Sequence, residues 1–340
     1  MKTLLHRALM MFALVFTLSA CSDQRELIHL NGSTMGTYYS IKLIKQEGLP
    51  SATDMQTEID RRLELVNDQM STYRKHSELS QFNQHQTNQP FEVSADTAKV
   101  VKEAIRLAKL TDGALDVTVG PVVNLWSFGP EARPEKTPTA DEITERKKIV
   151  GIHHLSVEGN TLKKDIPELY VDLSSIAKGF GVDVVADYFE ELNVADYLVE
   201  IGGELRLKGK NLEGVSWRIA IEKPTDDGSR SVQEIIEPGD MAVATSGDYR
   251  NYFEEDGVRY SHLIDPKTCK PISNHVVSVT VLHPSSMTAD ALATAFSVMG
   301  EEKSLELAQQ ESLPVLLVVK TEQGFKEYTS DAFVPYMQKK

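Results

Sequence analysis

Asp290 and Thr294 stand four residues apart in the stretch Ser286–Gly300, and both carry oxygen atoms that could hold a cation. Alanine, leucine and methionine make this stretch a good helix former, and a helix places both residues on one face. A carboxylate beside a hydroxyl suits a hard cation such as Mg²⁺. The simpler interpretation is that Asp290 only benefits from lying near a helix start, where acids are favoured. The pair alone leaves both interpretations open.

A second candidate site is the turn that opens Ser174–Asp183. Tyr170–Leu173 has the composition of a strand end, and small residues with Lys178 begin a helix that we expect to reach about Leu192. Backbone N–H groups and the helix dipole at such a start can bind an anion. The spacing of a Walker A loop is absent from this stretch. Lys178 is therefore either part of an anion site or an ordinary solvated lysine.

Three other side chains have the chemistry of a site. The sequence contains nine histidines, and His262 adjoins a turn rather than an exposed helix, although most histidines have a structural role. Trp126 and Phe128 either belong to the core or stack on an aromatic ligand, and the core is the default.

The composition limits the class of protein. The chain has 340 residues, of which 41% are hydrophobic and 25% charged, so it is globular with a sizeable core. The net charge of −14 argues against a nucleic-acid-binding protein, which needs a basic face to neutralise phosphates.

The first twenty residues read as a targeting segment rather than as part of the fold. Lys2 and Arg7 form a positive region, and the apolar run Ala8–Thr17 is short for a membrane span. Leu18-Ser19-Ala20-Cys21 resembles a bacterial lipobox, which implies cleavage before Cys21 and its acylation. An ordinary secretory signal and a short anchor helix are the alternatives.

This interpretation divides the chain into a signal peptide (1–20), a lipidated Cys21 with a short tether (21–25), and a catalytic domain (26–340). It predicts a lipid-anchored protein that faces the bacterial periplasm from the inner membrane. Cys269 is the only other cysteine, so it has no intramolecular partner, and no thiol-catalysis signature surrounds it.

The elements that must position these residues mix helices and strands without a short repeat or a clear linker. We expect one α+β catalytic domain, formed as one lobe or as two lobes around a cleft. The predicted helices are 52–70, 94–111, 141–150, 174–192, 286–300 and 303–311, and the predicted strands are 37–44, 197–208 about a Gly-Gly turn, 217–222, 241–244, 276–283, 313–321 and a terminal strand or tail.

Short motifs occur one after another between about Gly32 and Phe333. They are Met35-Gly36-Thr37, Met70-Ser71-Thr72-Tyr73 with Ser77-Glu78, Gly113–Pro121, Asp172-Leu173 through Ile176-Ala177-Lys178-Gly179, Ile201-Gly202-Gly203, Thr245–Tyr249, His262–Pro266 and Ala289–Ala295. Each motif is weak alone, but the ordered set resembles the ApbE-type flavin transferases, which have a T-fold-like domain and move FMN from FAD onto a serine or threonine of another protein.

The resemblance implies a role for each matching position. It makes His262 the group that activates the acceptor hydroxyl, and it places Mg²⁺ on Asp290, Thr294 and the backbone carbonyl of Ser175. The residues that it sets against FAD are Met35, Tyr73, Ala114, Leu115, Asp116, Asp172, Lys178 and Ile264.

The sequence departs from the family pattern in two places. Ser174-Ser175 stands where the family often has two glycines, which a carbonyl ligand tolerates because the main chain supplies it. Cys269 stands where a glycine is common after Asp-Pro-x-Thr, which puts the geometry of that turn in question.

Three functions fit these residues. The first is Mg²⁺-dependent transfer of FMN from FAD to a protein hydroxyl with release of AMP; the resemblance implies membrane acceptors such as subunits of sodium-pumping quinone reductases. The second is hydrolysis of FAD to FMN and AMP at the same site. The third is a lipid-anchored protein that binds FAD without catalysis. The products of the reaction distinguish the three.

Overall fold

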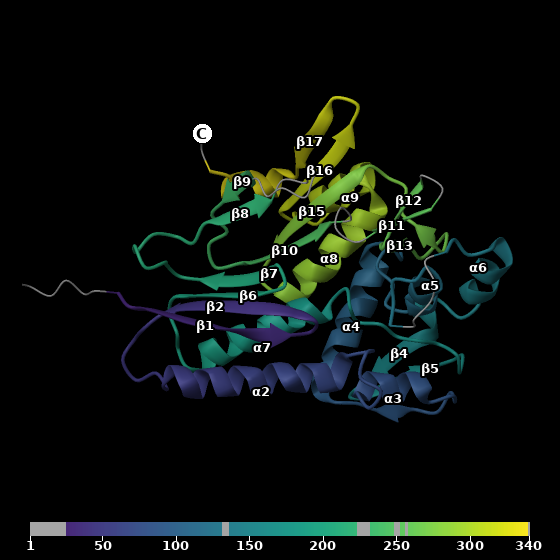
Figure 1. Cartoon of the computed structure of the whole chain (residues 1–340), viewed down its shortest axis with the longest axis horizontal. Helices are drawn as coiled ribbons and strands as arrows, with labels where there is room; N and C mark the ends of the chain where they lie inside the picture. Colours follow the sequence, from purple (N-terminus) through teal and green to yellow (C-terminus); the bar gives the residue numbers. More distant parts are fainter. Residues whose placement is uncertain (1–24, 131–135, 223–231, 248–251, 256–257, 339–340) are drawn as a thin grey trace, which may run out of the picture.

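The computed structural model describes residues 25–130, 136–222, 232–247, 252–255 and 258–338 (Figure 1). The predicted signal peptide and Cys21 lie outside these ranges, and Arg25 is the first described residue of the predicted tether. No helix within the described ranges combines the length and the apolar character that crossing a membrane requires.

An antiparallel eight-stranded sheet organises the fold (Figure 1). Its strands follow the order β1-β2-β6-β7-β10-β15-β16-β17, and each neighbouring pair is antiparallel. The bounds are β1 Leu27–Thr34, β2 Thr37–Ile44, β6 Tyr197–Ile201, β7 Glu204–Lys208, β10 Ala242–Gly247, β15 Val276–His283, β16 Val315–Thr321 and β17 Gly324–Thr329.

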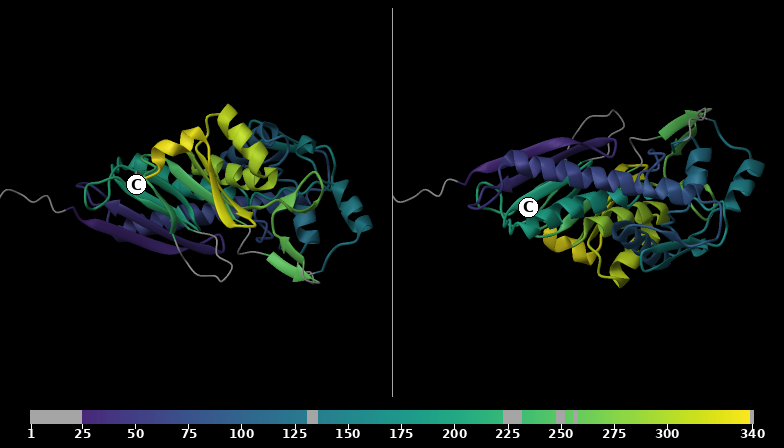
Figure 2. Two further views of the ribbon diagram at one scale, coloured as in Figure 1. Left: turned by 90° about the horizontal axis from the view of Figure 1, so that it is seen from above. Right: turned by 90° about the horizontal axis from the view of Figure 1, so that it is seen from below.

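Different elements pack on the two faces of this sheet, and successive side chains of a strand point to opposite faces. In β6, Val199 packs in a buried cluster with residues of α2 and α7, whereas Leu198 packs in another cluster with Trp217 and Phe333. The views in Figure 2 show α2 running along the face of the sheet that the helices cover. The helices are α2 Ala52–Met70, α3 Glu78–Gln84, α4 Ala95–Leu110, α5 Gly120–Leu125, α6 Ala140–Lys147, α7 Ala177–Glu191, α8 Ser286–Met299 and α9 Glu301–Gln310, with 3₁₀ turns η1 Ile152–His154 and η2 Asp331–Tyr336.

Smaller sheets of two or three short strands accompany the main sheet. They are β3 Phe91–Glu92, β4 Leu155–Glu158 and β5 Thr161–Lys164 in one sheet; β8 Ile219–Glu222 with β9 Val232–Ile236; β11 Tyr252–Glu255 with β12 Val258–Ser261; and β13 Ile264–Asp265 with β14 Lys270–Pro271.

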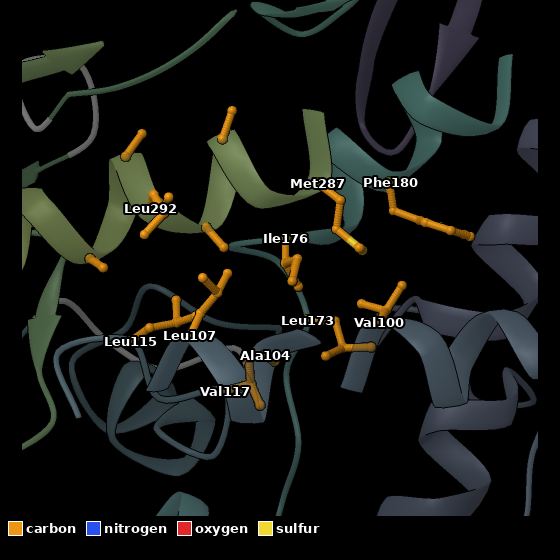
Figure 3. Close-up of a cluster of buried hydrophobic side chains, with 14 of the residues drawn as sticks. Val100, Ala104, Leu107, Leu115, Val117, Leu173, Ile176, Phe180, Met287 and Leu292 are labelled. Carbon is orange, nitrogen blue, oxygen red and sulfur yellow. The ribbon is translucent and has the colours of Figure 1, made fainter. Parts of the chain in front are cut away.

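The helices α7 and α8 pack against each other, and a buried cluster fixes the loops beside them (Figure 3). Leu107 of α4, Leu292 of α8, and Leu115, Leu173 and Ile176 of the loops all point into this cluster. The sequence neighbours of Leu115 and Leu173 line a cavity instead of the core. The core therefore sets which loop residues are available to a ligand.

The α+β architecture expected from the sequence is confirmed, and most predicted elements occur within a few residues of their expected bounds. The strand predicted at Tyr170–Leu173 is wrong. That segment forms no strand and joins no sheet. The Val171 N–H donates to Asn83 Oδ1 over 2.8 Å and the Val171 carbonyl accepts from Asn83 Nδ2 over 2.8 Å. One amide side chain thus takes the place of a neighbouring strand.

Candidate active site

A cavity of about 440 Å³ lies where α7 and α8 meet the loops around residues 114–129 and 262–266. It brings together nearly all the site residues expected from the sequence. Those that line it are Tyr73, Ala114, Leu115, Asp116, Asp172, Ser175, Lys178, His262, Ile264, Asp290 and Thr294.

Met35 is the exception, because it lines a neighbouring cavity of about 810 Å³. The two cavities share Tyr73, Ser174 and Lys178. Met35 and Gly36 form the turn between β1 and β2 with φ values of 49° and 72°, a backbone conformation typical of a two-residue hairpin loop. The turn places Met35 close to α7, since a Cβ on Gly181 would lie 2.7 Å from its Cε.

Asp290 lies on α8 with only 5% of its surface exposed. Its Oδ2 accepts a hydrogen bond of 2.9 Å from the backbone N–H of Gly179, in the first turn of α7. This close approach requires glycine, since a Cβ at position 179 would lie 2.3 Å from the carbonyl oxygen of Ser286. Burial raises the pKa of the Asp290 carboxyl, and the nearby Lys178 ammonium opposes that shift.

Lys178 lies between two carboxylates. Its Nζ is 2.5 Å from Oε1 of Glu204 and 3.8 Å from Oδ1 of Asp290. Burial disfavours its charge, but Asp290 and Glu204 outweigh that effect and hold the Lys178 pKa above its usual range. Lys178 is therefore not an ordinary solvated lysine: 33% of its side chain is exposed, but its ammonium is paired with two buried carboxylates at the cavity wall.

The donors at this site suit a hard cation. Asp290 and Thr294 lie one turn apart on α8, and Ser175 lines the same cavity. Across the described residues, no group of three or more His, Cys, Asp and Glu side chains has the arrangement of a metal site. Zn²⁺ is normally held by such a group, whereas Mg²⁺ commonly uses one or two carboxylates, other oxygens and the phosphates of a substrate. Because Asp290, Thr294 and the Ser175 carbonyl offer oxygen donors, the residues present fit a hard cation such as Mg²⁺.

The carboxylates of Asp116 and Asp172 have local hydrogen-bond partners. Asp116 accepts bonds from the N–H and hydroxyl of Thr118 and from the N–H of Ile152, over 2.6 to 3.0 Å. Burial raises the Asp116 pKa and these bonds oppose the shift. Asp172 accepts bonds from the N–H and hydroxyl of Ser174. Both carboxylates thus fix the shape of the loops that line the cavity.

His262 lies on the cavity wall, in the loop between β12 and β13. Its ring meets the ring of Phe128 edge to face, with centroids 6.3 Å apart. Phe128 also lines the cavity, whereas Trp126 is buried and donates its indole N–H to the carbonyl of Cys269 over 3.1 Å. The core interpretation thus holds for Trp126, whereas Phe128 packs against the same buried cluster and also lines the cavity.

The two departures from the family pattern have different consequences. Ser174 and Ser175 do not have positive φ values, so side chains there cause no backbone strain. Cys269 has a φ of 56°, a left-handed conformation that favours glycine. The turn is closed by a 2.8 Å hydrogen bond from the Cys269 N–H to the Asp265 carbonyl, and the thiol is buried.

Glu204 belongs to this site although no sequence motif singles it out. It lines the cavity, is only 4% exposed and forms the shortest described contact of Lys178. The one local signal is an acid directly after the Gly202-Gly203 turn, at a position where a strand normally buries an apolar side chain.

Comparisons with known proteins show which family this chain resembles. A model of the ApbE family matches residues 35–317. The chain is 64% identical over 331 residues to an FAD:protein FMN transferase of Vibrio cholerae serotype O1, with 97% of this chain and 99% of that protein covered. It is 40% identical over 316 residues to the protein of that name from Escherichia coli K12, covering 92% and 90%.

A solved structure shows the same fold. The flavin transferase ApbE from Vibrio cholerae matches with a TM-score of 0.87 at 64% identity, and the match covers 92% of this chain and 99% of that chain. The resemblance indicated by the ordered motifs is therefore confirmed, and this chain belongs to the ApbE family.

Proposed function

We propose that this chain is an Mg²⁺-dependent FAD:protein FMN transferase that acts on a serine or threonine hydroxyl. The acceptor oxygen attacks the phosphorus of the FMN half of FAD. The bond from that phosphorus to the oxygen bridging the two phosphates breaks, and AMP departs with that oxygen. The acceptor then carries FMN through a phosphoester, and no oxidant or reductant is consumed. The family match and the full-length relatives support the transfer of flavin from FAD to protein.

The cluster of Asp290, Lys178 and the start of α7 is suited to a pyrophosphate. The Lys178 ammonium offers positive charge and hydrogen bonds to phosphate oxygens, and the positive end of the α7 dipole adds to the attraction. Asp290 and Thr294, with the carbonyl of Ser175, would hold Mg²⁺, which when bound neutralises phosphate charge and favours departure of AMP.

His262 is suited to take the proton of the acceptor hydroxyl. A serine or threonine hydroxyl is a weak nucleophile at neutral pH, so a base within hydrogen-bond reach accelerates attack. His262 lines the same cavity as Lys178 and Asp290, and Phe128 restricts its ring on one side. Tyr73, which is 70% exposed and lines both cavities, and Met35, which lines the neighbouring one, would cover the rings of FAD.

The acceptor and the cellular location complete the proposal. The acceptors are membrane redox subunits with an exposed serine or threonine, such as those of sodium-pumping quinone reductases. A lipid on Cys21 would hold the enzyme on the periplasmic side of the inner membrane, next to these substrates. The lipobox-like sequence before Cys21 supports this part of the proposal.

The observation that carries the metal-dependent chemistry is the placement of Asp290 and Thr294 on the cavity wall beside Lys178. The test compares wild type, Asp290→Ala and Thr294→Val in a transfer assay with FAD and an acceptor domain. Asp141→Ala, at an exposed position of α6, is the matched control. We expect EDTA to abolish transfer, Mg²⁺ to restore it, and Asp290→Ala to lower it at least ~100-fold. Transfer that survives both EDTA and Asp290→Ala would overturn the metal-dependent mechanism.

A further inference from the structure

Glu204 occupies an unusual position for a buried acid. It begins β7, directly after the turn Gly202-Gly203, and its side chain reaches the cavity wall. Oε1 accepts a bond from Lys178, but Oε2 is buried with no hydrogen-bond partner among the described residues. A buried carboxylate oxygen without a hydrogen-bond partner lowers the stability of the fold. The side chain therefore calls for a functional explanation.

The distances around Lys178 suggest a function for Glu204. The ammonium contacts Glu204 Oε1 at 2.5 Å and lies 3.8 Å from Asp290 Oδ1, which is within ion-pair distance but longer than a hydrogen bond. The other oxygen of Asp290 is already occupied by the Gly179 N–H. Oδ1 is thus the Asp290 oxygen left for a cation, and Lys178 would cover it if no other carboxylate held the ammonium away.

We infer that Glu204 is a positioning residue that holds Lys178 away from Asp290 and so keeps Asp290 Oδ1 open for Mg²⁺. This inference rests on the metal-dependent function proposed above. One ammonium shared between two carboxylates moves toward the one that remains when the other loses its charge. Without Glu204, Lys178 would compete with the cation for the same oxygen.

Glu204→Gln tests this without removing the hydrogen-bonding capacity of the side chain. FAD binding is followed by flavin fluorescence during titration with Mg²⁺. We expect the Mg²⁺ concentration for half-maximal binding to rise about 10-fold or more, as when a group that orients a metal ligand is removed. In a crystal structure of the metal-free variant, Lys178 Nζ should approach Asp290 Oδ1 to about 2.8 Å.

The double variant Lys178→Met/Glu204→Gln separates this role from a direct one. If Glu204 acts through Lys178, adding Glu204→Gln to Lys178→Met shifts the half-maximal Mg²⁺ concentration no more than about threefold. An equal shift in both backgrounds would overturn the inference, because Glu204 would then act on the cation or on FAD directly. Glu200→Gln, in the preceding strand and outside the cavity lining, controls for the loss of one charge in this hairpin.

The titration of wild type distinguishes failure of the inference from failure of the proposed function. Wild-type FAD binding that responds to Mg²⁺, together with an unchanged response in Glu204→Gln, contradicts only the role of Glu204. Wild-type binding that is indifferent to Mg²⁺ contradicts both. The thermal unfolding temperature of each variant is compared with that of wild type, so that a shift in Mg²⁺ response can be separated from loss of structure.

Discussion

The backbone N–H of Gly179 donates a 2.9 Å hydrogen bond to Oδ2 of Asp290 and so joins the first turn of α7 to α8. The two helices come from distant parts of the chain, and Asp183 of α7 also accepts hydrogen bonds from the Ser285 hydroxyl and from the N–H groups of Ser286 and Met287 at the start of α8. Of these contacts, the bond from Gly179 is the one that involves Asp290. This contact fixes one oxygen of Asp290 and leaves the other toward Lys178 and the cavity. The geometry of the candidate metal site therefore depends on how closely α7 approaches α8.

The first prediction concerns this approach. In Gly179→Ala, the added Cβ would lie 2.3 Å from the Ser286 carbonyl oxygen and 2.8 Å from Asp290 Cβ, so the helices must separate. We expect a loss of about 1–3 kcal/mol in the free energy of unfolding, measured by chemical denaturation, and weaker Mg²⁺-dependent FAD binding.

Gly181→Ala is the matched control for stability in the same helix. Its Cβ would meet the flexible end of Met35 rather than backbone, so we expect a small change in stability. Equal destabilisation by the two substitutions would show that the contact between Gly179 and Asp290 has no special role.

The second prediction concerns His262. His262→Ala should lower the rate of transfer to the acceptor by about 10²–10⁴-fold, the usual contribution of a general base. FAD binding should stay close to that of wild type, since this role concerns the acceptor hydroxyl rather than the pyrophosphate. Single-turnover transfer and fluorescence titration measure the two effects. A parallel loss of binding and rate would instead assign His262 to FAD recognition.

The third prediction concerns Lys164, which is buried and donates to three backbone carbonyls, those of Phe82, Asn83 and Leu169. Burial lowers the Lys164 pKa to about 8. The unfolded chain then binds more protons than the folded chain between about pH 8 and pH 10, where an ordinary lysine titrates. The contribution of Lys164 to stability therefore increases as the pH rises through that window.

Lys164→Met removes this dependence. The stability of wild type relative to Lys164→Met should increase from pH 7 to pH 10, as measured by denaturant unfolding at each pH. Lys163→Met changes the exposed neighbour on the same strand and should show no such trend. A flat difference for Lys164→Met would mean that the folded protein does not shift this pKa.

The fourth prediction concerns Cys21. Cys21→Ala should move the protein from the membrane fraction to the soluble periplasmic fraction, or leave its signal peptide uncleaved, because the sulfur that would carry the lipid is missing. Transfer by the purified protein should be unchanged. Intact-mass measurement of wild type should show the mass of acyl chains. An unmodified wild-type protein would rule out the lipid anchor.

The sequence was most informative where functional side chains lie within one element and follow its residue spacing. Asp290 and Thr294 share a helix, so their four-residue spacing was enough to predict a common face. The β6–β7 hairpin around Gly202-Gly203 was equally readable, because a strong turn signal separates two β-rich runs.

The features that the sequence did not reveal depend on contacts between distant segments. Nothing local in Tyr170–Leu173 indicates that the amide of Asn83 replaces a neighbouring strand. The contact between Lys178 and Glu204 likewise joins α7 to β7, and its length follows from the packing of that helix on the sheet. The burial of Leu115 and Leu173 likewise depends on α4 and α8, which supply the other side chains of that cluster (Figure 3).

The most direct test of the proposed function counts the products of one reaction. Protein beginning at Ser22 is incubated with FAD, Mg²⁺ and an acceptor domain, and intact-mass spectrometry of the acceptor is combined with an assay of AMP. An acceptor whose target serine or threonine is replaced by alanine is the control. We predict one AMP released for each FMN attached, and no adduct on the control acceptor. Release of AMP with free FMN and no adduct on an acceptor that a related flavin transferase does modify would contradict the account and identify the protein as an FAD pyrophosphatase.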